Sequence, residues 1–242
     1  MNNIAIIPAR AGSKRIPGKN LIDFGGIPLI EWTIKAALQS EVFKVIIIDT
    51  DDMDIYQKYN YKYIDAQRVQ VRLRSLASAS DDMTPVHIPV LQRLEALKNS
   101  ENQIFDTVTL LMATSPLRSY KDIQDAHMQF NRLYRNRSLF QISAYEAVNH
   151  AWGMYKGPSG EGEAIPINGR ALKARSQDLK PVYLPTGAVW IADYDALIEH
   201  KTFYGPGYSL FIMDEIAAVD IDTPRDLAKA EAYLELYQKR GW

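Results

Sequence analysis

Short apolar runs and stretches with apolar residues at helical spacing alternate along most of the chain. Continuous apolar runs that end at polar residues or proline are typical of strands buried in a parallel sheet. Helices are expected where apolar residues recur every three or four positions. The pattern predicts strands at residues 3–8, 45–49, 107–112, 187–191 and 210–213, and helices at 28–40, 85–99, 122–134 and 224–240. This alternation predicts an α/β fold with a mostly parallel sheet flanked by helices.

The alternation stops between residues 145 and 185. Several glycines interrupt this stretch, and no helical spacing runs through it. Long irregular loops inside compact domains commonly have a function or pack against a partner. We therefore interpret 145–185 as a small β-rich arm used in dimerisation, and we expect residues 1–242 to form a single domain around it.

The composition is that of an ordinary globular protein, since 47% of the 242 residues are hydrophobic and 24% are charged. Lys plus Arg number 28 and Asp plus Glu number 29, which gives a net charge of −1. This balance argues against a globally basic protein that binds nucleic acid or a membrane surface. No apolar run approaches the length of a membrane helix and no signal peptide is visible, so we expect a cytoplasmic location. The absence of cysteine excludes disulfides, thiolate metal sites and cysteine nucleophiles.

Positive charge is concentrated directly after the first predicted strand. Residues 10–20 contain no acidic residue and four basic ones, Arg10, Lys14, Arg15 and Lys19. Ligands of open α/β sheets bind beyond the carboxyl ends of the strands, where this loop begins. Gly12 and Gly18 let the backbone turn and approach a ligand closely, and cationic side chains there suit a triphosphate. The alternative is a solvated basic turn.

The glycine spacing in this loop excludes two common phosphate-binding motifs. A Walker P-loop has four residues between its glycines and Ser or Thr after its lysine. Here five residues separate Gly12 from Gly18, and Asn20 follows Lys19. The dinucleotide fingerprint has glycines but few positive charges. The loop therefore predicts phosphate binding without ordinary ATPase chemistry.

A pair of carboxylates lies near the other end of the chain. Asp220 and Asp222 are two residues apart in a segment expected to be extended, and residues i and i+2 of a strand share one face. Both carboxylates would then converge on one cation, and oxygen ligands next to phosphates suit Mg²⁺. The alternative is that Asp222 caps a helix that starts at Thr223 and Pro224.

Other polar residues at strand ends are weaker candidates. Asp49, Asp51 and Asp52 follow the second predicted strand and either contact a metal or nucleotide or simply begin a helix. Arg72 and Arg74 reach either a ligand or water. The four histidines show no ligand spacing, so no histidine metal site is expected.

Residues 6–20, Ile-Ile-Pro-Ala-Arg-Ala-Gly-Ser-Lys-Arg-Ile-Pro-Gly-Lys-Asn, resemble the signature of the acylneuraminate cytidylyltransferases, also called CMP-sialic acid synthetases. Residues 114–118, 184–188 and 220–226 resemble later motifs of that family, in the same order. The resemblance covers essentially the whole chain. It implies a Rossmann-like nucleotidyltransferase fold and transfer of CMP from CTP to the anomeric hydroxyl of a nonulosonic acid, a nine-carbon 2-keto sugar acid, with Mg²⁺ and release of pyrophosphate. It also implies a homodimer whose arm closes the partner's site.

By position, the resemblance assigns nucleotide binding to the first loop and to one later arginine: Arg10, Gly12, Ser13, Lys14, Lys19, Asn20 and Arg72. It implies that Asp220 and Asp222 hold the metal. Arg10, Lys19 and Asp220 are the predicted catalytic residues, and the general base is left open between Asp220 and a metal-bound hydroxide.

Departures from the family pattern cluster on the predicted sugar side of the site. The chain has Met112-Ala-Thr-Ser-Pro where sialate-specific members usually have Gln-Pro-Thr-Ser-Pro, and Leu184-Pro-Thr-Gly where they have Arg-Pro-Asn-Gly. An arginine expected near Ser176 is absent, although Arg175 is adjacent. The predicted sugar-binding residues are Met112, Thr114, Ser115, Arg175, Gln177, Thr186 and Gly187. We therefore expect a different nonulosonic acid, of the legionaminic or pseudaminic type.

Three alternative functions stay open. Kdo-type cytidylyltransferases usually have a less basic first loop without the Lys-Asn end, so Lys19 and Asn20 count against that class. A nucleotidyltransferase acting on a phosphosugar would differ in its nucleotide selectivity. A noncatalytic nucleotide-binding module is expected to lack the acidic pair, which is present here.

Overall fold

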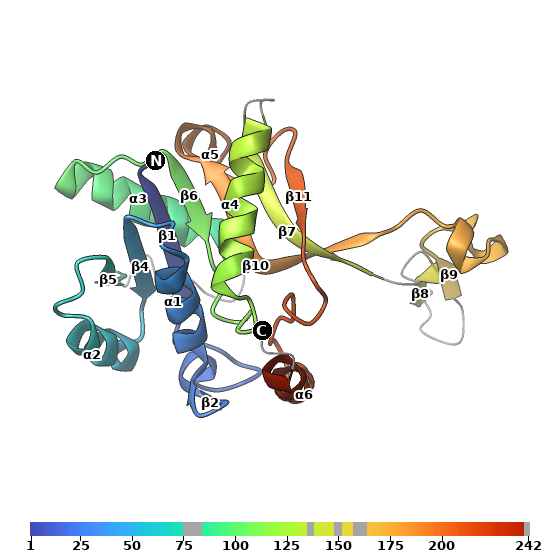
Figure 1. The fold of residues 1–242 in the computed structure, drawn as a ribbon, viewed down its shortest axis with the longest axis horizontal. Helices are drawn as coiled ribbons and strands as arrows, with labels where there is room; N and C mark the ends of the chain where they lie inside the picture. The colour runs from blue at the N-terminus through green and yellow to red at the C-terminus, as the bar shows by residue number, and fades with distance from the viewer. Residues whose placement is uncertain (75–83, 135–137, 148–151, 157–163, 240–242) are drawn as a thin grey trace.

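One large sheet forms the centre of the computed structural model, which describes residues 1–74, 84–134, 138–147, 152–156 and 164–239 (Figure 1). Seven strands form this sheet, namely β1 (Asn3–Ala9), β4 (Val45–Thr50), β5 (Val69–Leu73), β6 (Thr107–Leu110), β7 (Phe140–Glu146), β10 (Tyr183–Asp193) and β11 (Ser209–Ile212). A separate short hairpin joins β2 (Asp23–Phe24) to β3 (Ile27–Pro28). The seven strands of the sheet lie side by side in the order β11–β7–β10–β6–β1–β4–β5.

All but one of these strands run in the same direction. Strand β1 pairs in parallel with β4 and β6, β4 pairs in parallel with β5, and β11 pairs in parallel with β7. Strand β10 is antiparallel to both of its neighbours, β6 and β7. The prediction of a mostly parallel sheet is confirmed. The loops that leave β1, β4, β5 and β6 therefore meet at one edge of the sheet, which is where ligands of such sheets bind.

Of the six α-helices in the described residues, five cover the two faces of the sheet and the last packs beyond its edge (Figure 1). In chain order the helices are α1 (Leu29–Ser40), α2 (Met53–Lys62), α3 (His87–Glu101), α4 (Tyr120–Tyr134), α5 (Tyr194–His200) and α6 (Pro224–Lys239). The predictions of α1, α3, α4 and α6 are confirmed to within a few residues. Strands β5 and β7 and helices α2 and α5 were not expected from the sequence pattern.

The alternation of side chains along β1 creates two separate cores. Ala5 and Ile7 pack on one face with residues of α1, α2 and α4, whereas Ile4 and Ile6 pack on the other face with residues of α3 and α5. All four side chains are fully buried. Because both faces are covered, the strand reads as a continuous apolar run rather than an alternating one.

A third apolar cluster joins the start of the chain to its end. Ile16 and Phe24, from the segment after β1, pack with Ile221 and with Ala230 and Leu234 of α6. Ile221 is fully buried and lies between the two aspartates of the late acidic pair. This cluster brings residues 10–24 against residues 219–234, and so places the basic loop beside the acidic pair.

The region between β7 and β10 projects away from the sheet (Figure 1). Its described residues contain a two-stranded hairpin, β8 (Met154–Lys156) and β9 (Ala164–Pro166), and two short 3-10 helices, η4 (Ala171–Lys173) and η5 (Ser176–Asp178). We call residues 152–156 and 164–182 the arm. Part of the predicted excursion, 148–151 and 157–163, lies outside the described residues. The single-domain organisation and the role of the arm in dimerisation stay predictions.

Within the described part of the chain, no helix has the length and apolar character needed to cross a membrane.

Candidate active site

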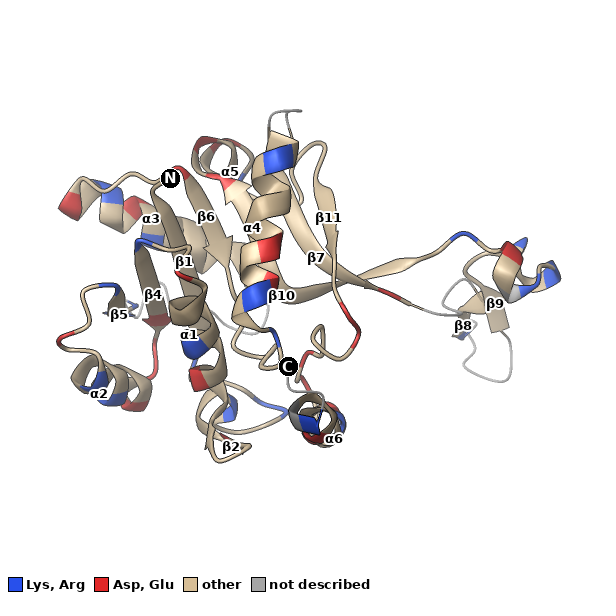
Figure 2. Cartoon of the chain, in the orientation of Figure 1, with Lys and Arg blue, Asp and Glu red and all other residues tan. Residues whose placement is uncertain are grey.

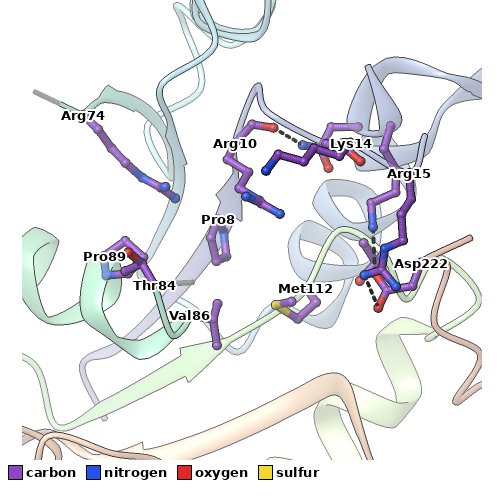
Figure 3. A pocket seen from close by; sticks show the side chains of 14 residues that line it. Pro8, Arg10, Lys14, Arg15, Arg74, Thr84, Val86, Pro89, Met112 and Asp222 are labelled. Atoms are coloured by element: carbon purple, nitrogen blue, oxygen red, sulfur yellow. Dashed lines mark hydrogen bonds and ion pairs between the residues drawn. The ribbon is translucent and has the colours of Figure 1, made fainter. Parts of the chain in front are cut away.

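A pocket of about 450 Å³ opens where the loops after β1, β5 and β6 meet (Figure 3). Its lining residues include five cations, Arg10, Lys14, Arg15, Lys19 and Arg74, and one carboxylate, that of Asp222. Ser13, Asn20, Met112 and Thr114 also line it. A concentration of positive charge of this kind suits a polyanion such as a nucleoside triphosphate. The gathering of these cations around one pocket favours a ligand-binding loop over a merely solvated basic turn.

The basic loop is held in shape by hydrogen bonds at both ends. The Asn20 side-chain amide donates to the carbonyl of Arg10 at 3.1 Å, and the Asp51 carboxylate accepts from the backbone N–H of Ala11 at 2.8 Å. Gly18 adopts a left-handed conformation with φ of 62°, which favours glycine at this turn. Gly12 belongs to the same loop but is not among the residues that line the pocket. Contacts within the chain and the turn at Gly18 thus define the path of the loop.

Asp222 joins this loop through two ion pairs. Its Oδ1 lies 3.0 Å from Nζ of Lys19, and its Oδ2 lies 3.1 Å from Nη2 of Arg15. Lys19 also donates to the backbone carbonyl of Ile221 at 2.8 Å. The Asp222 carboxylate remains about half exposed, so it is open to the pocket as well as paired.

The start of α6 is capped without the Asp222 side chain. The Thr223 hydroxyl accepts from the N–H of Asp226, and the Asp226 carboxylate accepts from the N–H and hydroxyl of Thr223. This reciprocal pattern is a capping box, with Pro224 at the first helical position. The alternative that Asp222 serves as the helix cap is therefore wrong.

Asp220 lies in a different environment from Asp222. Its Oδ1 is buried and has no hydrogen-bond partner among the described residues. Burial raises the pKa of its carboxyl above the ordinary value. The nearby Thr114 hydroxyl and the charge of Lys19 oppose this rise, and the negative charges of Asp222 and Asp226 add to it. Asp220 lines a second, smaller pocket of about 190 Å³ together with Tyr145 and Thr186.

The expectation that the acidic pair shares one face of a strand is wrong. Residues 219–223 form no strand, and the two carboxylates line two different pockets. The backbone N–H of Ile221 donates instead to the carbonyl of Thr114 at 2.8 Å, which fixes the segment against the loop after β6. The aspartates therefore flank Ile221 as it enters the core.

The two aspartates nevertheless fit a divalent cation. Mg²⁺ typically takes one or two carboxylates, with its other ligands supplied by water and substrate phosphates. Asp220 offers a buried carboxylate oxygen without a partner, and Asp222 offers a half-exposed carboxylate beside a cationic pocket. The described residues contain no group of three or more His, Cys, Asp or Glu side chains able to hold a metal, so any site here depends on this pair.

The loop after β6 forms the wall of the pocket nearest to β10. The N–H of Met112 donates to the carbonyl of Gly187 at 3.0 Å. A Cβ atom on Gly187 would lie 2.5 Å from Cγ of Met112, so glycine is required for this close approach. The Ser115 hydroxyl is buried beside it and has no partner among the described residues. Met112 and Thr114 reach the pocket, and Gly187 sets how close Met112 lies to the sheet.

Arg118 supports this wall from inside the protein. Its side chain is 1% exposed, and its guanidinium donates to the carbonyl of Ala188 at 2.6 Å and to the hydroxyl of Thr33 at 2.7 Å. Burial lowers the pKa of Arg118 to about 10, so it remains charged at neutral pH. In the sequence this arginine belongs to a motif, but only the structure shows that it connects α1, the loop after β6 and β10.

The structure does not gather all the predicted sugar-binding residues in one place. Thr186 lines the smaller pocket, where its hydroxyl donates to the carbonyl of Ala218 at 2.9 Å. Arg175 and Gln177 lie on the exposed arm, and Arg175 pairs there with Asp178 at 2.9 Å. These two residues therefore lie outside both pockets of their own chain.

Arg72 also lies outside the cationic pocket. It pairs with Glu101 at 2.7 Å and donates to the Gln70 side chain, while Arg74, two residues later, lines the pocket. The structure thus favours Arg74 over Arg72 as the arginine that meets a ligand. Of the weaker acidic candidates, Asp52 caps α2 and Asp49 pairs with Arg74.

The sequence model of a family described as Cytidylyltransferase matches residues 4–153, which is more than half of the chain. The chain belongs to the cytidylyltransferase family. It is 36% identical over 237 residues to a Campylobacter jejuni protein named pseudaminic acid cytidylyltransferase, covering 96% of this chain and 95% of that one. The resemblance identified from the sequence motifs is confirmed, and with it the enzyme class.

Two further relatives differ in the sugar acid that their names carry. A Legionella pneumophila protein named CMP-N,N'-diacetyllegionaminic acid synthase is 32% identical, with 99% of both chains covered. An N-acylneuraminate cytidylyltransferase of Streptococcus agalactiae is 30% identical, with 97% of this chain and 54% of that longer protein covered.

Solved structures show the same fold at low sequence identity. A CMP:2-keto-3-deoxy-manno-octonic acid synthetase complexed with CTP superposes with a TM-score of 0.68 at 16% identity, covering 98% of this cytidylyltransferase and 99% of that chain. A 4-diphosphocytidyl-2C-methyl-D-erythritol synthase gives a TM-score of 0.66 at 12% identity, with 96% and 99% covered. At these identities the likeness concerns the fold alone.

Proposed function

We propose that this enzyme transfers CMP from CTP to the anomeric hydroxyl of a nonulosonic acid and releases pyrophosphate. The observation that carries the proposal is the single pocket that joins the basic loop to Asp222, because this reaction needs positive charge around a triphosphate. The names of the relatives support both the donor and the class of acceptor.

In the proposed reaction, the anomeric oxygen of the sugar forms a bond to the α-phosphorus of CTP. The bond from that phosphorus to the bridging oxygen of the β-phosphate breaks, and the electron pair leaves with pyrophosphate. Arg10 and Lys19 bind phosphate oxygens and offset the negative charge that develops on them. The hydrogen bonds of Asn20 and Asp51 to the backbone of this loop support such a role, because they limit the reorganisation that the reaction would need.

Asp220 and Asp222 would hold Mg²⁺ in this proposal. When bound, the ion would supply further positive charge to the phosphate oxygens. The ion pairs of Asp222 with Lys19 and Arg15 place cationic side chains next to the same carboxylate. Asp220, with a carboxylate oxygen that has no hydrogen-bond partner among the described residues, is also the candidate among this chain's own residues for accepting the proton of the sugar hydroxyl.

We propose a legionaminic- or pseudaminic-type acid as the acceptor. The departures at Met112 and Leu184 from the usual sialate pattern support this, and so do the names of two relatives. The test is a panel of sugar acids with CTP, in which pyrophosphate release is measured. The panel contains pseudaminic, legionaminic and N-acetylneuraminic acids, Kdo and a sugar 1-phosphate, and each is repeated with ATP, GTP and UTP.

We expect pyrophosphate release with CTP and one of the first two acids. A clear preference for N-acetylneuraminic acid would contradict the proposed acceptor while leaving the reaction intact. A preference for Kdo or for a sugar phosphate would support the corresponding alternative enzyme. CTP binding without pyrophosphate release from any acceptor would support a noncatalytic module.

We further propose that two copies form a dimer, that each arm helps to close the site of the other copy, and that the enzyme acts in the cytoplasm, where CTP is made. Lys and Arg lie along the described part of the arm (Figure 2). In the sequence, residues 148–182 contain five cations, Lys156, Arg170, Lys173, Arg175 and Lys180, and three acids, Glu161, Glu163 and Asp178. Such an arm suits the carboxylate of a sugar acid or the phosphates of CTP. Arg175 and Gln177 would then bind the acceptor across the dimer interface.

A further inference from the structure

A buried carboxylate beside the pocket takes no part in the reaction as proposed above. Asp49, near the end of β4, is 1% exposed, and its two oxygens hold two different arginines. Oδ2 accepts from Nε of Arg74, and Oδ1 accepts from Nε of Arg93 at 2.7 Å. A carboxylate at this depth needs such partners, because an unpaired buried charge is costly.

Arg74 is held by the backbone as well as by this ion pair. Its Nη2 donates to the carbonyl of Asp49 at 3.0 Å, and its own N–H donates to the carbonyl of Thr50 at 2.7 Å. Figure 3 shows the side chain extending from the end of β5 toward Arg10 and Pro8. Arg74 therefore enters the pocket in a fixed direction.

Arg93 lies on the other side of the same carboxylate. It belongs to α3, and its Nη2 donates to the carbonyl of Leu73 at 3.1 Å. Among the described residues, those that line the cationic pocket include Arg74 but not Arg93. Asp49 thus keeps two like-charged guanidinium groups in defined places, and of these two only Arg74 lines the cationic pocket.

We propose that Asp49 is a positioning residue for nucleotide binding, which acts by holding Arg74 in the pocket. The inference rests on the proposed function, in which CTP occupies this pocket. An arginine whose rotamer is already fixed loses less conformational freedom when it binds a ligand. Without Asp49, Arg74 and Arg93 would repel each other, and the direction of Arg74 would no longer be set.

The test measures CTP binding to the full chain by calorimetry, without an acceptor, and the steady-state constants with one. We expect Asp49→Asn to weaken CTP binding about tenfold, since hydrogen bonds to charged groups are the strong ones. The KM for CTP should rise more than kcat falls. Arg74→Lys keeps the positive charge but loses the planar, forked set of N–H donors of the guanidinium, so it should weaken CTP binding to a similar degree. Adding Asp49→Asn to Arg74→Lys should then cause little further loss.

Glu31→Gln is the matched control. Glu31 is also a buried carboxylate, 5% exposed, and it pairs with Lys62 at 2.6 Å away from the cationic pocket. This variant should lose stability but bind CTP as the unaltered chain does. Equal weakening of CTP binding by Glu31→Gln and Asp49→Asn would overturn the inference, because it would reveal a general effect of lost stability.

Two further results would also decide against the inference. Unchanged CTP affinity in Arg74→Lys would do so even if Asp49→Asn failed to fold. Full and additive losses in the double variant would show that Asp49 does not act through Arg74. Failure of the unaltered chain to bind CTP would instead overturn the proposed function, together with the inference that depends on it.

Discussion

The ammonium of Lys19 lies 3.0 Å from a carboxylate oxygen of Asp222, although 203 positions separate the two residues in the chain. The contact exists because Ile16, Phe24 and Ile221 share an apolar cluster with α6. Packing of apolar side chains thus brings together the two charged segments that the sequence marks as unusual. The fold and the site are connected at this point.

Asp222→Asn should lower kcat by about 10²–10³-fold, because it removes a carboxylate proposed to hold the Mg²⁺ that would offset the charge of the phosphates. It should also raise the Mg²⁺ concentration needed for half-maximal rate, and a chelator should abolish pyrophosphate release by the unaltered enzyme. A titration of rate against Mg²⁺ measures both effects. Asp54→Asn, at an exposed position on α2, is the control and should change neither. Normal turnover and normal Mg²⁺ dependence in a folded Asp222→Asn variant would show that Asp222 has no role in the active site.

Arg10→Ala and Arg175→Ala test whether the arm serves the neighbouring copy. Each variant alone should be nearly inactive, since one loses a phosphate ligand and the other a residue of the arm. Mixed and allowed to exchange subunits, the two should recover about a quarter of the activity, because half of the dimers then contain one complete site of two. A mixture of either variant with Arg132→Ala, exposed on α4, controls for dilution. No recovery despite demonstrated exchange would place Arg175 in its own chain's site or in none.

Gly187→Ala should raise the KM for the sugar acid more than the KM for CTP. The added methyl group would overlap the Met112 side chain and push it into the pocket. Overpacking of this kind also costs about 1–3 kcal/mol of stability. Gly205→Ala is the matched control, because its methyl group would overlap Phe140 in the core between β7 and α5, away from the pocket. The prediction fails if the two variants change the two KM values alike.

Acid should destabilise the protein partly through His127. This histidine is 4% exposed, and burial lowers its pKa from 6.5 to about 3. The unfolded chain therefore binds the proton first, so stability falls as the pH drops from 6.5 toward 3, by roughly 1 kcal/mol per pH unit. Urea unfolding at pH 7, 6, 5 and 4 measures this loss. His127→Gln should be less stable at pH 7 but lose less on acidification, and parallel curves for the two proteins would refute the role of His127.

The sequence was sufficient for five of the seven strands of the large sheet and for the basic loop, because these depend on local patterns. The apolar runs of β1, β4 and β6 are continuous in the sequence, as expected for strands whose side chains are buried on both faces. The four cations of the basic loop all lie within residues 10–20. The elements that were missed have weaker local signals. Helix α2, for example, is mostly polar and buries only Ile55 and Tyr59.

The position of single side chains was harder to predict for a physical reason. Successive residues of a strand point to opposite faces, but a motif does not say where the strand ends. Arg72 still lies within β5, whereas Arg74 follows its last residue and turns toward the pocket. Asp220 and Asp222 differ for the same reason, because their segment proved irregular. Nothing in the sequence around Arg118 indicates that this charged side chain is buried.

The hydrogen bond from the Asn20 amide to the Arg10 carbonyl has a thermodynamic consequence, and so does the hydrogen bond from the Ala11 N–H to the Asp51 carboxylate. We expect these hydrogen bonds to order residues 10–20 while the chain folds, so that little ordering entropy is lost when a nucleotide binds. The heat-capacity change on CTP association should therefore match the surface in contact, without the added signature of a segment that folds around its ligand.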